Sequence, residues 1–391
     1  MKFVLFYHSL VSDWNHGNAH FLRGVVTELM ARGHQVEVYE PTDSWSRQNL
    51  VADQGGAAVE AFHAAFPRLR SHCYDPHALE LEPVLDGADV VIVHEWNTPE
   101  LVAEVGRAHR GAAGQVLLFH DTHHRSVTAP EEMRRYALRD YDGTLAFGEA
   151  IRRRYIENGW SERVWTWHEA ADTRLFRPRP EIPREHDLVW IGNWGDGERA
   201  RELREYLIEP VAALGLDADL HGVRYPGDAL EALALAGIRH HGWIANHQVP
   251  EAFARHRVTV HVPRGPYVEA LPGIPTIRVF EALACGIPLA SAPWHDDENL
   301  FSPGRDYLVA GNGEDMRDKL RSILGEPDLA AELARHGLAT IRARHTCAHR
   351  VDELLAILAT LRSGTPAARH ASTGGAAGGA TEPTHGVVLD A

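Results

Sequence analysis

The stretch Leu271–Trp294, LPGIPTIRVFEALACGIPLASAPW, predicts a loop, a helix and a strand in quick succession. Apolar residues recur at helical spacing from Ile277 to Ala284, and a strand-like run begins at Pro288. The Pro- and Gly-rich segment before the helix is a shaped loop that ends at a helix N-terminus, where free backbone N–H groups and the helix dipole face outward. Glu281 interrupts the apolar face of this helix. The stretch therefore contains free hydrogen-bond donors at the start of the helix and a carboxylate on its apolar face, and both are candidates for binding a ligand.

Composition bounds the possible functions. At 391 residues the chain is long enough for two domains with a core each. It carries 39 Lys and Arg against 54 Asp and Glu, a formal net charge of −15. This balance argues against general adhesion to nucleic acid or anionic membranes. We expect small molecules or specific surfaces as partners, and no nucleic acid.

Three features predict a protein of the reducing cytoplasm. Cys73, Cys285 and Cys347 are too widely spaced for a disulfide framework or a zinc site. The apolar run at the start of the chain is too short to span a membrane and has no cleavage pattern. We expect it to be the first strand of a soluble domain, with no integral membrane segment.

Short apolar runs alternate with longer amphipathic stretches in two series. The first series starts at Phe3–Tyr7, and the second starts at Leu188–Ile191. This alternation is typical of parallel sheets with helices on both faces, so the predicted fold class is α/β with two Rossmann-like domains. Three prolines and several charges between the series mark the boundary near residues 178–186. The cleft between the domains is the default ligand site.

A polar loop follows the first strand. Asn15, Gly17 and Asn18 stand just before a helix and are expected to rim the cleft. The loop is not GxGxxG, which disfavours a nicotinamide cofactor. The alternative is that the three residues only form a turn and a helix cap.

A second polar cluster, LLFHDTHHRSV, follows another buried strand. It contains His120, Asp121, His123 and His124. These side chains could position a ligand, form a structural loop or bind a single metal ion. No HExxH or second ligand cluster supports the metal, so we expect none.

Five stretches resemble GT-B glycosyltransferases of the family-4 type. VWTWHEAADTRLFRP is similar to the interdomain hinge of that family, and VWIGNWGDGERARELREYL to the glycine-bearing strand exit that opens its second domain. GWIANHQVPEAFARHRVTVHVPR resembles the segment ahead of the strand below the donor. PTIRVFEALACGIPLASAPWHDDENLFSPGRDYLV resembles the donor-binding helix and following strand, in the CgeB-like branch. RHTCAHRVDELL is also similar to that branch.

This resemblance implies a GT-B organisation with four parts. They are an acceptor-side domain (1–178), a nucleotide-sugar donor domain (179–345), a helix that crosses back to the first domain (346–362) and a Gly- and Ala-rich disordered tail (363–391). The resemblance is specific over most of residues 188–361 and weak before them. It makes the expected activity transfer of a sugar from a nucleoside-diphosphate sugar.

The resemblance also gives Glu281 a role. In the family, the loop and helix N-terminus face the diphosphate, and this Glu binds the ribose hydroxyls. The physics agrees, because a helix N-terminus attracts phosphate and a carboxylate accepts strong hydrogen bonds. The alternative is that Glu281 points to solvent at the edge of an amphipathic helix.

One departure from the family concerns the donor sugar. Family-4 enzymes place a second Glu eight positions before the ribose-binding one, and here that residue is Gly273. The backbone N–H groups of Gly273, Ile274 and Thr276 are expected to contact donor oxygens instead. This puts the identity of the sugar in doubt more than the presence of the nucleotide.

Arginines are the expected diphosphate contacts. Arg199, or alternatively Arg201, follows the strand exit that contains Gly192 and Asn193 and is the first candidate. Arg264 is a second candidate and Arg278, at the helix start, a third; each could instead be a surface arginine.

The implied reaction needs no cofactor beyond a UDP or GDP sugar. Transfer in similar enzymes retains the anomeric configuration without bound metal, and cations with a helix N-terminus stabilise the leaving diphosphate. Asn18 and the expected catalytic residues His120 and Asp121 would position the acceptor, which could be a glycan, a small metabolite or a protein. Two alternatives stay open: a sugar-nucleotide epimerase of the same fold and a non-catalytic nucleotide-sugar-binding protein.

Overall fold

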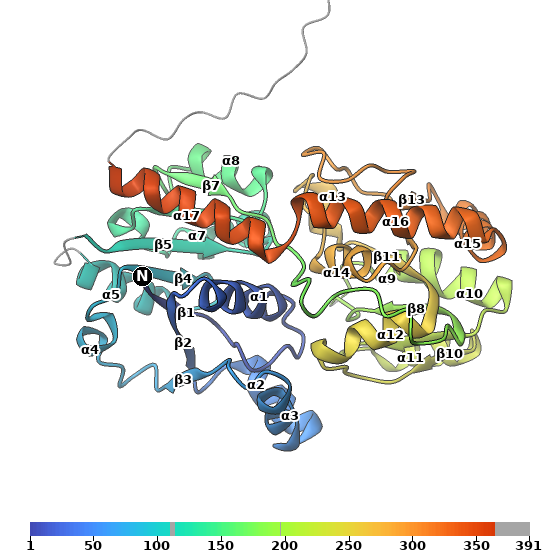
Figure 1. Ribbon diagram of the computed structural model, residues 1–391, viewed down its shortest axis with the longest axis horizontal. Helices are drawn as coiled ribbons and strands as arrows, with labels where there is room; N and C mark the ends of the chain where they lie inside the picture. Colours follow the sequence, from blue (N-terminus) through green and yellow to red (C-terminus); the bar gives the residue numbers. More distant parts are fainter. Residues whose placement is uncertain (110–113, 196, 364–391) are drawn as a thin grey trace, which may run out of the picture.

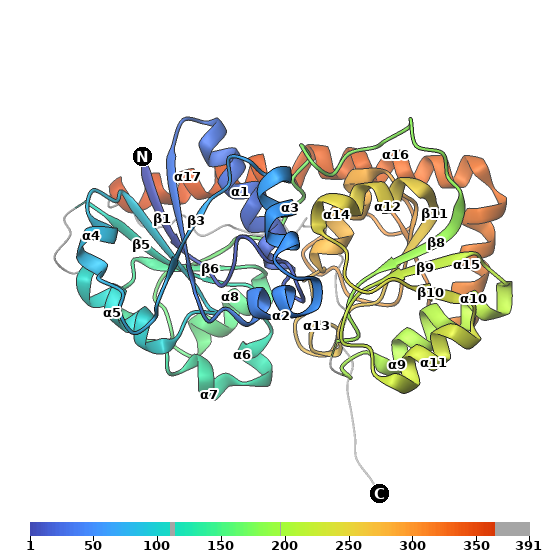
Figure 2. The same cartoon turned by 90° about the horizontal axis from the view of Figure 1, so that it is seen from below.

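A computed structural model describes residues 1–109, 114–195 and 197–363, and in these ranges the chain forms two α/β domains side by side (Figure 1). The tail predicted over 363–391 lies outside the described residues except for Ser363. Figure 2 shows the same two domains from below, with the predicted donor helix facing the first domain.

The first domain is built on a parallel sheet. In the described residues it has seven strands in the order β3-β2-β1-β4-β5-β6-β7, with all neighbours parallel. The strands are β1 (Lys2–Phe6), β2 (Gln35–Pro41), β3 (Ser71–Tyr74), β4 (Val90–His94), β5 (Val116–Asp121), β6 (Gly143–Ala146) and β7 (Val164–Thr166). Because side chains alternate along a strand, Phe3 and Leu5 join one core and Val4 and Phe6 join the core on the opposite face.

Helices cover both faces of this sheet, as an all-parallel sheet requires. They are α1 (Asn18–Ala31), α2 (Trp45–Gln54), α3 (Ala57–Ala65), α4 (Leu81–Leu85), α5 (Pro99–His109), α6 (Arg125–Thr128), α7 (Pro130–Met133), the 3₁₀ turn η1 (Leu138–Asp140) and α8 (Glu149–Glu157).

The second domain repeats the plan. Its sheet in the described part of the chain has six parallel strands in the order β10-β9-β8-β11-β12-β13. The strands are β8 (His186–Ile191), β9 (Ala218–His221), β10 (Ile238–His240), β11 (His256–His261), β12 (Leu289–Ser291) and β13 (Leu308–Val309). The helical segments are α9 (Ala200–Leu203), η2 (Arg204–Ile208), α10 (Glu209–Leu214), α11 (Gly227–Leu235), η3 (Asn246–Gln248), α12 (Val249–Arg255), α13 (Gly265–Glu269), α14 (Ile277–Cys285), α15 (Gly313–Gly325) and α16 (Pro327–Arg344). The two predicted series of βα units are thus confirmed.

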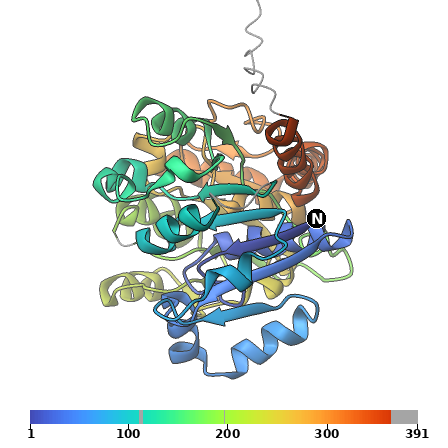
Figure 3. The same ribbon diagram turned by 90° about the vertical axis from the view of Figure 1, so that its left-hand side faces the viewer.

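The last helix, α17 (Cys347–Ser363), crosses back to the first domain. Its Val351, Leu354 and Leu358 are buried in the core formed by β1 and α1. Gly24 of α1 leaves room for Cys347, since a Cβ at this glycine would overlap the cysteine sulfur. Figure 3 shows α17, in red, along the first domain. The helix begins and ends one residue later than the predicted range 346–362.

The chain crosses between the domains twice, and the two crossings run side by side. Ala171, between β7 and β8, pairs with Thr346, between α16 and α17. The Ala171 N–H donates to His345 O at 3.1 Å, and the Cys347 N–H donates to Ala171 O at 3.0 Å. The two segments that connect the domains are therefore also hydrogen-bonded to each other.

Candidate functional site

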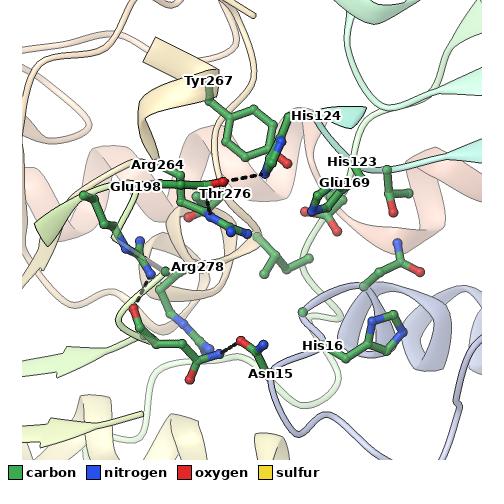
Figure 4. A pocket seen from close by; sticks show the side chains of 18 of the residues that line it. Asn15, His16, His123, His124, Glu169, Glu198, Arg264, Tyr267, Thr276 and Arg278 are labelled. Atoms are coloured by element: carbon green, nitrogen blue, oxygen red, sulfur yellow. Dashed lines mark hydrogen bonds and ion pairs between the residues drawn. The ribbon is translucent and has the colours of Figure 1, made fainter. Parts of the chain in front are cut away.

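A cavity of about 520 Å³ lies between the two domains, at the carboxyl ends of both sheets. We call its two sides the N wall and the C wall. The N wall comprises Asn15, His16, Gly17, Asn18, Trp45, Trp96, Thr122, His123, His124, Phe147 and Glu169. The C wall comprises Trp190, Ile191, Gly192, Asn193, Gly195, Glu198, Arg199, Arg224, Val260, His261, Arg264, Tyr267, Pro275, Thr276, Ile277 and Arg278. Its size is that of a small-molecule site, and Figure 4 shows the two walls facing each other.

The N-terminus of α14 opens into this cavity. Thr276 is the N-cap residue, and its side chain does not cap the helix. Pro275, Thr276, Ile277 and Arg278 all line the cavity. The helix ends at Gly286, which adopts the left-handed conformation at φ 67° that glycine tolerates. The loop and helix predicted from the sequence are therefore present, and the helix N-terminus is placed to attract an anion.

Arg199 is a buried cation on the C wall. Its guanidinium donates to Val262 O at 2.7 Å and to Asn193 O at 2.6 Å, and lies 5.2 Å above the centroid of Trp190. Its Nε has no hydrogen-bond partner. No carboxylate of the described residues forms an ion pair with it. Burial lowers the pKa of Arg199 to about 10, so the group is still charged at neutral pH; within the described part of the chain the charge of Glu198 acts on it without a direct ion pair.

The other two predicted arginines line the cavity with carboxylate partners. Arg264 Nε lies 2.5 Å from Glu198, and Arg278 Nη1 lies 2.5 Å from Glu281. Arg278 Nε also donates to Ile191 O at 3.1 Å. Arg201, the alternative to Arg199, is exposed and does not line this cavity.

The predicted rim residues lie at the contact between the domains. Asn193 Nδ2 donates to Asn15 Oδ1 at 2.6 Å, and Asn15 has a positive φ of 50°. Gly17 approaches Ile277, to which an added Cβ would lie 3.4 Å away. Asn18 lines the cavity and interacts with the Glu169 carboxyl, which opposes the rise in the pKa of that group. With Gly192, these residues all line the cavity.

Glu281 lies behind the C wall and is 1% exposed. Its carboxylate accepts from Asn246 Nδ2 at 3.1 Å and lies 2.8 Å from His20 Nδ1 of the first domain. Burial alone would raise the pKa of this carboxyl, but Arg278 and His20 hold it below its ordinary value. The alternative that Glu281 points to solvent is wrong. The carboxylate does not line the cavity and reaches it through Arg278.

Gly273 and Ile274 do not line the cavity, in contrast to our expectation. Gly273 has a φ of 89°, and its N–H donates to His295 O at 2.7 Å. Ile274 is 3% exposed and packs in the core of the first domain, against Gly148, where an added Cβ would overlap it. The physical reason is that an apolar side chain in this loop gains more from burial across the domain interface than from facing a polar cavity.

His120 and Asp121, expected to act in catalysis, also lie outside the cavity. They are the last residues of β5 and are 0% exposed. His120 Nδ1 lies 2.7 Å from the Tyr7 hydroxyl, and Asp121 accepts from the Tyr155 hydroxyl at 2.8 Å. Thr122, His123 and His124, the next residues along, reach the cavity instead. No group of three metal-ligating side chains is present in the described ranges.

Sequence reasoning missed Glu169, Trp45 and Trp96 as cavity residues. Glu169 is 7% exposed; burial, and secondarily the charge of Glu281, raise the pKa of its carboxyl to about 8. A signal was available for Glu169, because it stands in the segment that resembles the interdomain hinge. The two tryptophans follow β2 and β4 at the same sheet edge as the predicted rim, which is the signal that could have found them.

Comparison with known proteins agrees with this architecture. Residues 201–356 match a family model described as glycosyl transferase-like. No curated protein sequence matches the chain. None of the described helices is both long and apolar enough to cross a membrane.

Solved structures share the fold at low identity. Sucrose-phosphate synthase from Thermosynechococcus elongatus is 14% identical, with 93% of this chain and 100% of that chain covered and a TM-score of 0.62. Anabaena Alr3699/HepE in complex with UDP and glucose is 14% identical, with 92% and 100% covered and a TM-score of 0.66. An alpha-glucosyltransferase in complex with UDP and a short DNA is 11% identical, with 92% and 99% covered and a TM-score of 0.65.

These structures show that the chain has the two-domain GT-B fold. The family match places a glycosyl transferase-like region in its second domain. Fold and family match together support the assignment of the chain as a glycosyltransferase enzyme.

Proposed function

We propose that the protein transfers a sugar from a UDP or GDP sugar to an acceptor hydroxyl, with retention of the anomeric configuration and without a metal ion. The observation that carries this proposal is Arg199, a buried guanidinium on the C wall without a carboxylate partner in the described residues. A buried charge is costly unless an opposite charge accompanies it, so the site is built for an anion. The diphosphate of a nucleotide sugar supplies that anion.

The C wall has the remaining features that a departing diphosphate requires. The N-terminus of α14 and the guanidinium of Arg278 lie at the same cavity as Arg199. Fixed positive charge at these positions stabilises the negative charge that develops as the bond to the sugar breaks. Glu281 orients Arg278 through its 2.5 Å contact and so acts on a bound donor through this arginine.

The reaction balances without another reactant. The acceptor oxygen forms a bond to the anomeric carbon, and the bond from that carbon to the diphosphate oxygen breaks. The diphosphate keeps the electron pair and takes the proton of the acceptor hydroxyl. Closure of the two domains around the bound donor would exclude water and so favour transfer over hydrolysis of the donor. The free state of Cys73, Cys285 and Cys347 fits our proposal that this occurs in the cytoplasm.

A thermal-shift panel of UDP, GDP, ADP and CDP sugars tests the proposal, because a ligand that binds only the native state raises the melting temperature. The nucleotide sugar that raises the melting temperature most is then incubated with the protein, and the products are separated. Release of free nucleotide with the sugar lost from it supports a transferase. A changed sugar still attached to the nucleotide would instead show an epimerase, and stabilisation without any product would show a binding protein.

A further inference from the structure

The N wall contains two tryptophans whose rings pack against other side chains of the first domain. Trp45 and Trp96 are half-buried, and their ring centroids lie 6.0 Å apart at 71°. His8 packs on Trp45 at 4.7 Å, and the guanidinium of Arg125, which is paired with Glu95, lies 4.6 Å from the centre of Trp96. The two rings therefore present rigid apolar surface to the cavity at little entropic cost.

Beside these rings, the N wall has polar atoms without partners. His16 Nε2 and His123 Nδ1 have no hydrogen-bond partner within the described structure, and the amide of Asn18 interacts with the carboxyl of Glu169. His16 is 5% exposed and Asn18 is 7% exposed, and both line the cavity. Figure 4 shows His16, His123 and Glu169 on the side opposite Arg264 and Arg278. Buried polar atoms without a protein partner favour a ligand with both donors and acceptors, such as a set of hydroxyl groups.

The two walls also differ in charge. Among the described cavity residues, the N wall has no Lys or Arg and a single carboxyl, Glu169, whereas the C wall has four arginines. Burial lowers the pKa of His16 and of His123 well below 6.5, so these imidazoles are neutral at pH 7. Burial also raises the pKa of Glu169 to about 8, so its carboxyl is mainly protonated. A charged acceptor would find no compensating charge on its own side of the cavity.

We propose that the acceptor is an uncharged sugar whose ring lies against Trp45 and Trp96 and whose hydroxyls bond to His16, Asn18 and His123. This rests on the proposed function, since the C wall is reserved for the donor. A pyranose has an apolar C–H face and a polar rim of hydroxyls, and the N wall offers both complements. A phosphorylated or carboxylated sugar and a charged peptide are disfavoured, because the arginines that would attract them belong to the donor side.

The test uses saturation-transfer NMR on the full chain with UDP or GDP present, whichever stabilises it. The neutral probes are the methyl glycosides of glucose, galactose, mannose and N-acetylglucosamine, and the charged probes are glucose 6-phosphate and glucuronic acid. At least one neutral glycoside is expected to receive saturation at its ring C–H protons. The double variant Trp45→Leu/Trp96→Leu is expected to bind that glycoside about tenfold more weakly, with nucleotide affinity unchanged.

Trp160→Leu is the matched control, because Trp160 is a half-buried tryptophan of the same domain that packs on Tyr155 and does not line the cavity. This variant is expected to bind the glycoside like the wild type. Asn18→Ala, which removes one amide of the N wall, is a second variant with the same expected loss and replaces the double variant if the latter does not fold.

Three results would overturn the acceptor assignment alone: nucleotide binding with no neutral glycoside bound, tighter binding of a charged probe than of every neutral one, or unchanged glycoside affinity in the double variant and in Asn18→Ala. Failure of both UDP and GDP to bind, measured by calorimetry on the same wild-type sample, would overturn the proposed function and the acceptor assignment with it.

Discussion

The two walls of the cavity differ in charge and in residue type. The C wall places four arginines and the N-terminus of α14 around one space, while the N wall places neutral imidazoles, amides and tryptophan rings around the same space. Both walls stand at the carboxyl ends of similar parallel sheets. One fold used twice can therefore provide an anion-binding surface and an uncharged one, because the loops after the strands decide the chemistry.

Contacts between the domains hold the walls at a fixed separation. Asp13, which is paired with Arg23, accepts from Trp243 Nε1 at 2.9 Å and from the Asn246 N–H at 3.1 Å. At the opposite side, Glu298 lies 2.9 Å from His168 and accepts from the N–H of Glu149 at the start of α8. The two walls are therefore connected by direct hydrogen bonds and ion pairs on the described residues, and the predictions below act on a cavity with both walls in place.

Arg199→Gln would break the charge contrast between the walls and is expected to have the largest effect. Loss of a buried guanidinium opposite a diphosphate is expected to cost about 2 kcal/mol or more, roughly a thirtyfold rise in the dissociation constant of the nucleotide. Calorimetry measures this affinity. Arg201→Gln is the matched control, because Arg201 is an exposed neighbour whose side chain is 85% accessible. Equal losses in the two variants would show that Arg199 has no special position.

Glu281→Gln tests whether the carboxylate behind the C wall serves the donor. We expect about a tenfold loss of nucleotide affinity, since charged hydrogen bonds contribute roughly 1.5–3 kcal/mol and Arg278 loses its partner. The fold is expected to remain intact. Asn246→Ala is the control, because it removes a 3.1 Å hydrogen bond to the same carboxylate without changing the charge. A lowered melting temperature with unchanged affinity in both variants would make Glu281 purely structural.

Glu169→Gln sharpens the claim that the N wall is uncharged. The folded-state pKa of about 8 lies above the ordinary value of 4.5, so the folded state holds this proton more tightly and wild-type stability falls as the pH rises from about 4.5 to about 8. The Glu169→Gln variant has no carboxyl at this position, so its stability does not fall with pH for this reason. Its melting temperature is expected to exceed that of the wild type by a growing margin between pH 5 and pH 8. A constant difference across this range would mean that Glu169 titrates normally.

Removal of divalent metal is expected to have the smallest effect. Nucleotide affinity measured in EDTA and in magnesium is expected to be equal, because the cations of the C wall are part of the chain. If EDTA abolished nucleotide binding and magnesium restored it, this expectation would be wrong. A bound metal ion, and not the arginines of the C wall, would then hold the diphosphate.

The second domain was more predictable than the first. The βα pattern, the start of α14 after Thr276 and its end at Gly286 follow from local signals in the sequence. The arginines and Asn193 were also found, because their stretches resemble a known family. In the first domain the pattern located the sheet edge, and the rim residues Gly17 and Asn18 line the cavity.

The errors arose where burial depends on residues that are distant in the sequence. His120 and Asp121 end a strand, and only the packing of other elements of the domain decides that they are covered while His123 and His124 line the cavity. Ile274 is drawn out of the cavity by a pocket at Gly148, more than a hundred residues away in sequence. Such long-range packing leaves no local periodicity, so spacing alone does not reveal it.

A crystal structure of the protein with its preferred nucleoside diphosphate tests the central claim most directly. The account predicts the diphosphate oxygens at hydrogen-bond distance from Arg199 Nε and from the first backbone N–H groups of α14, with the Trp45–Trp96 surface left open for the acceptor. A diphosphate bound against the N wall, or outside the cavity altogether, would contradict it.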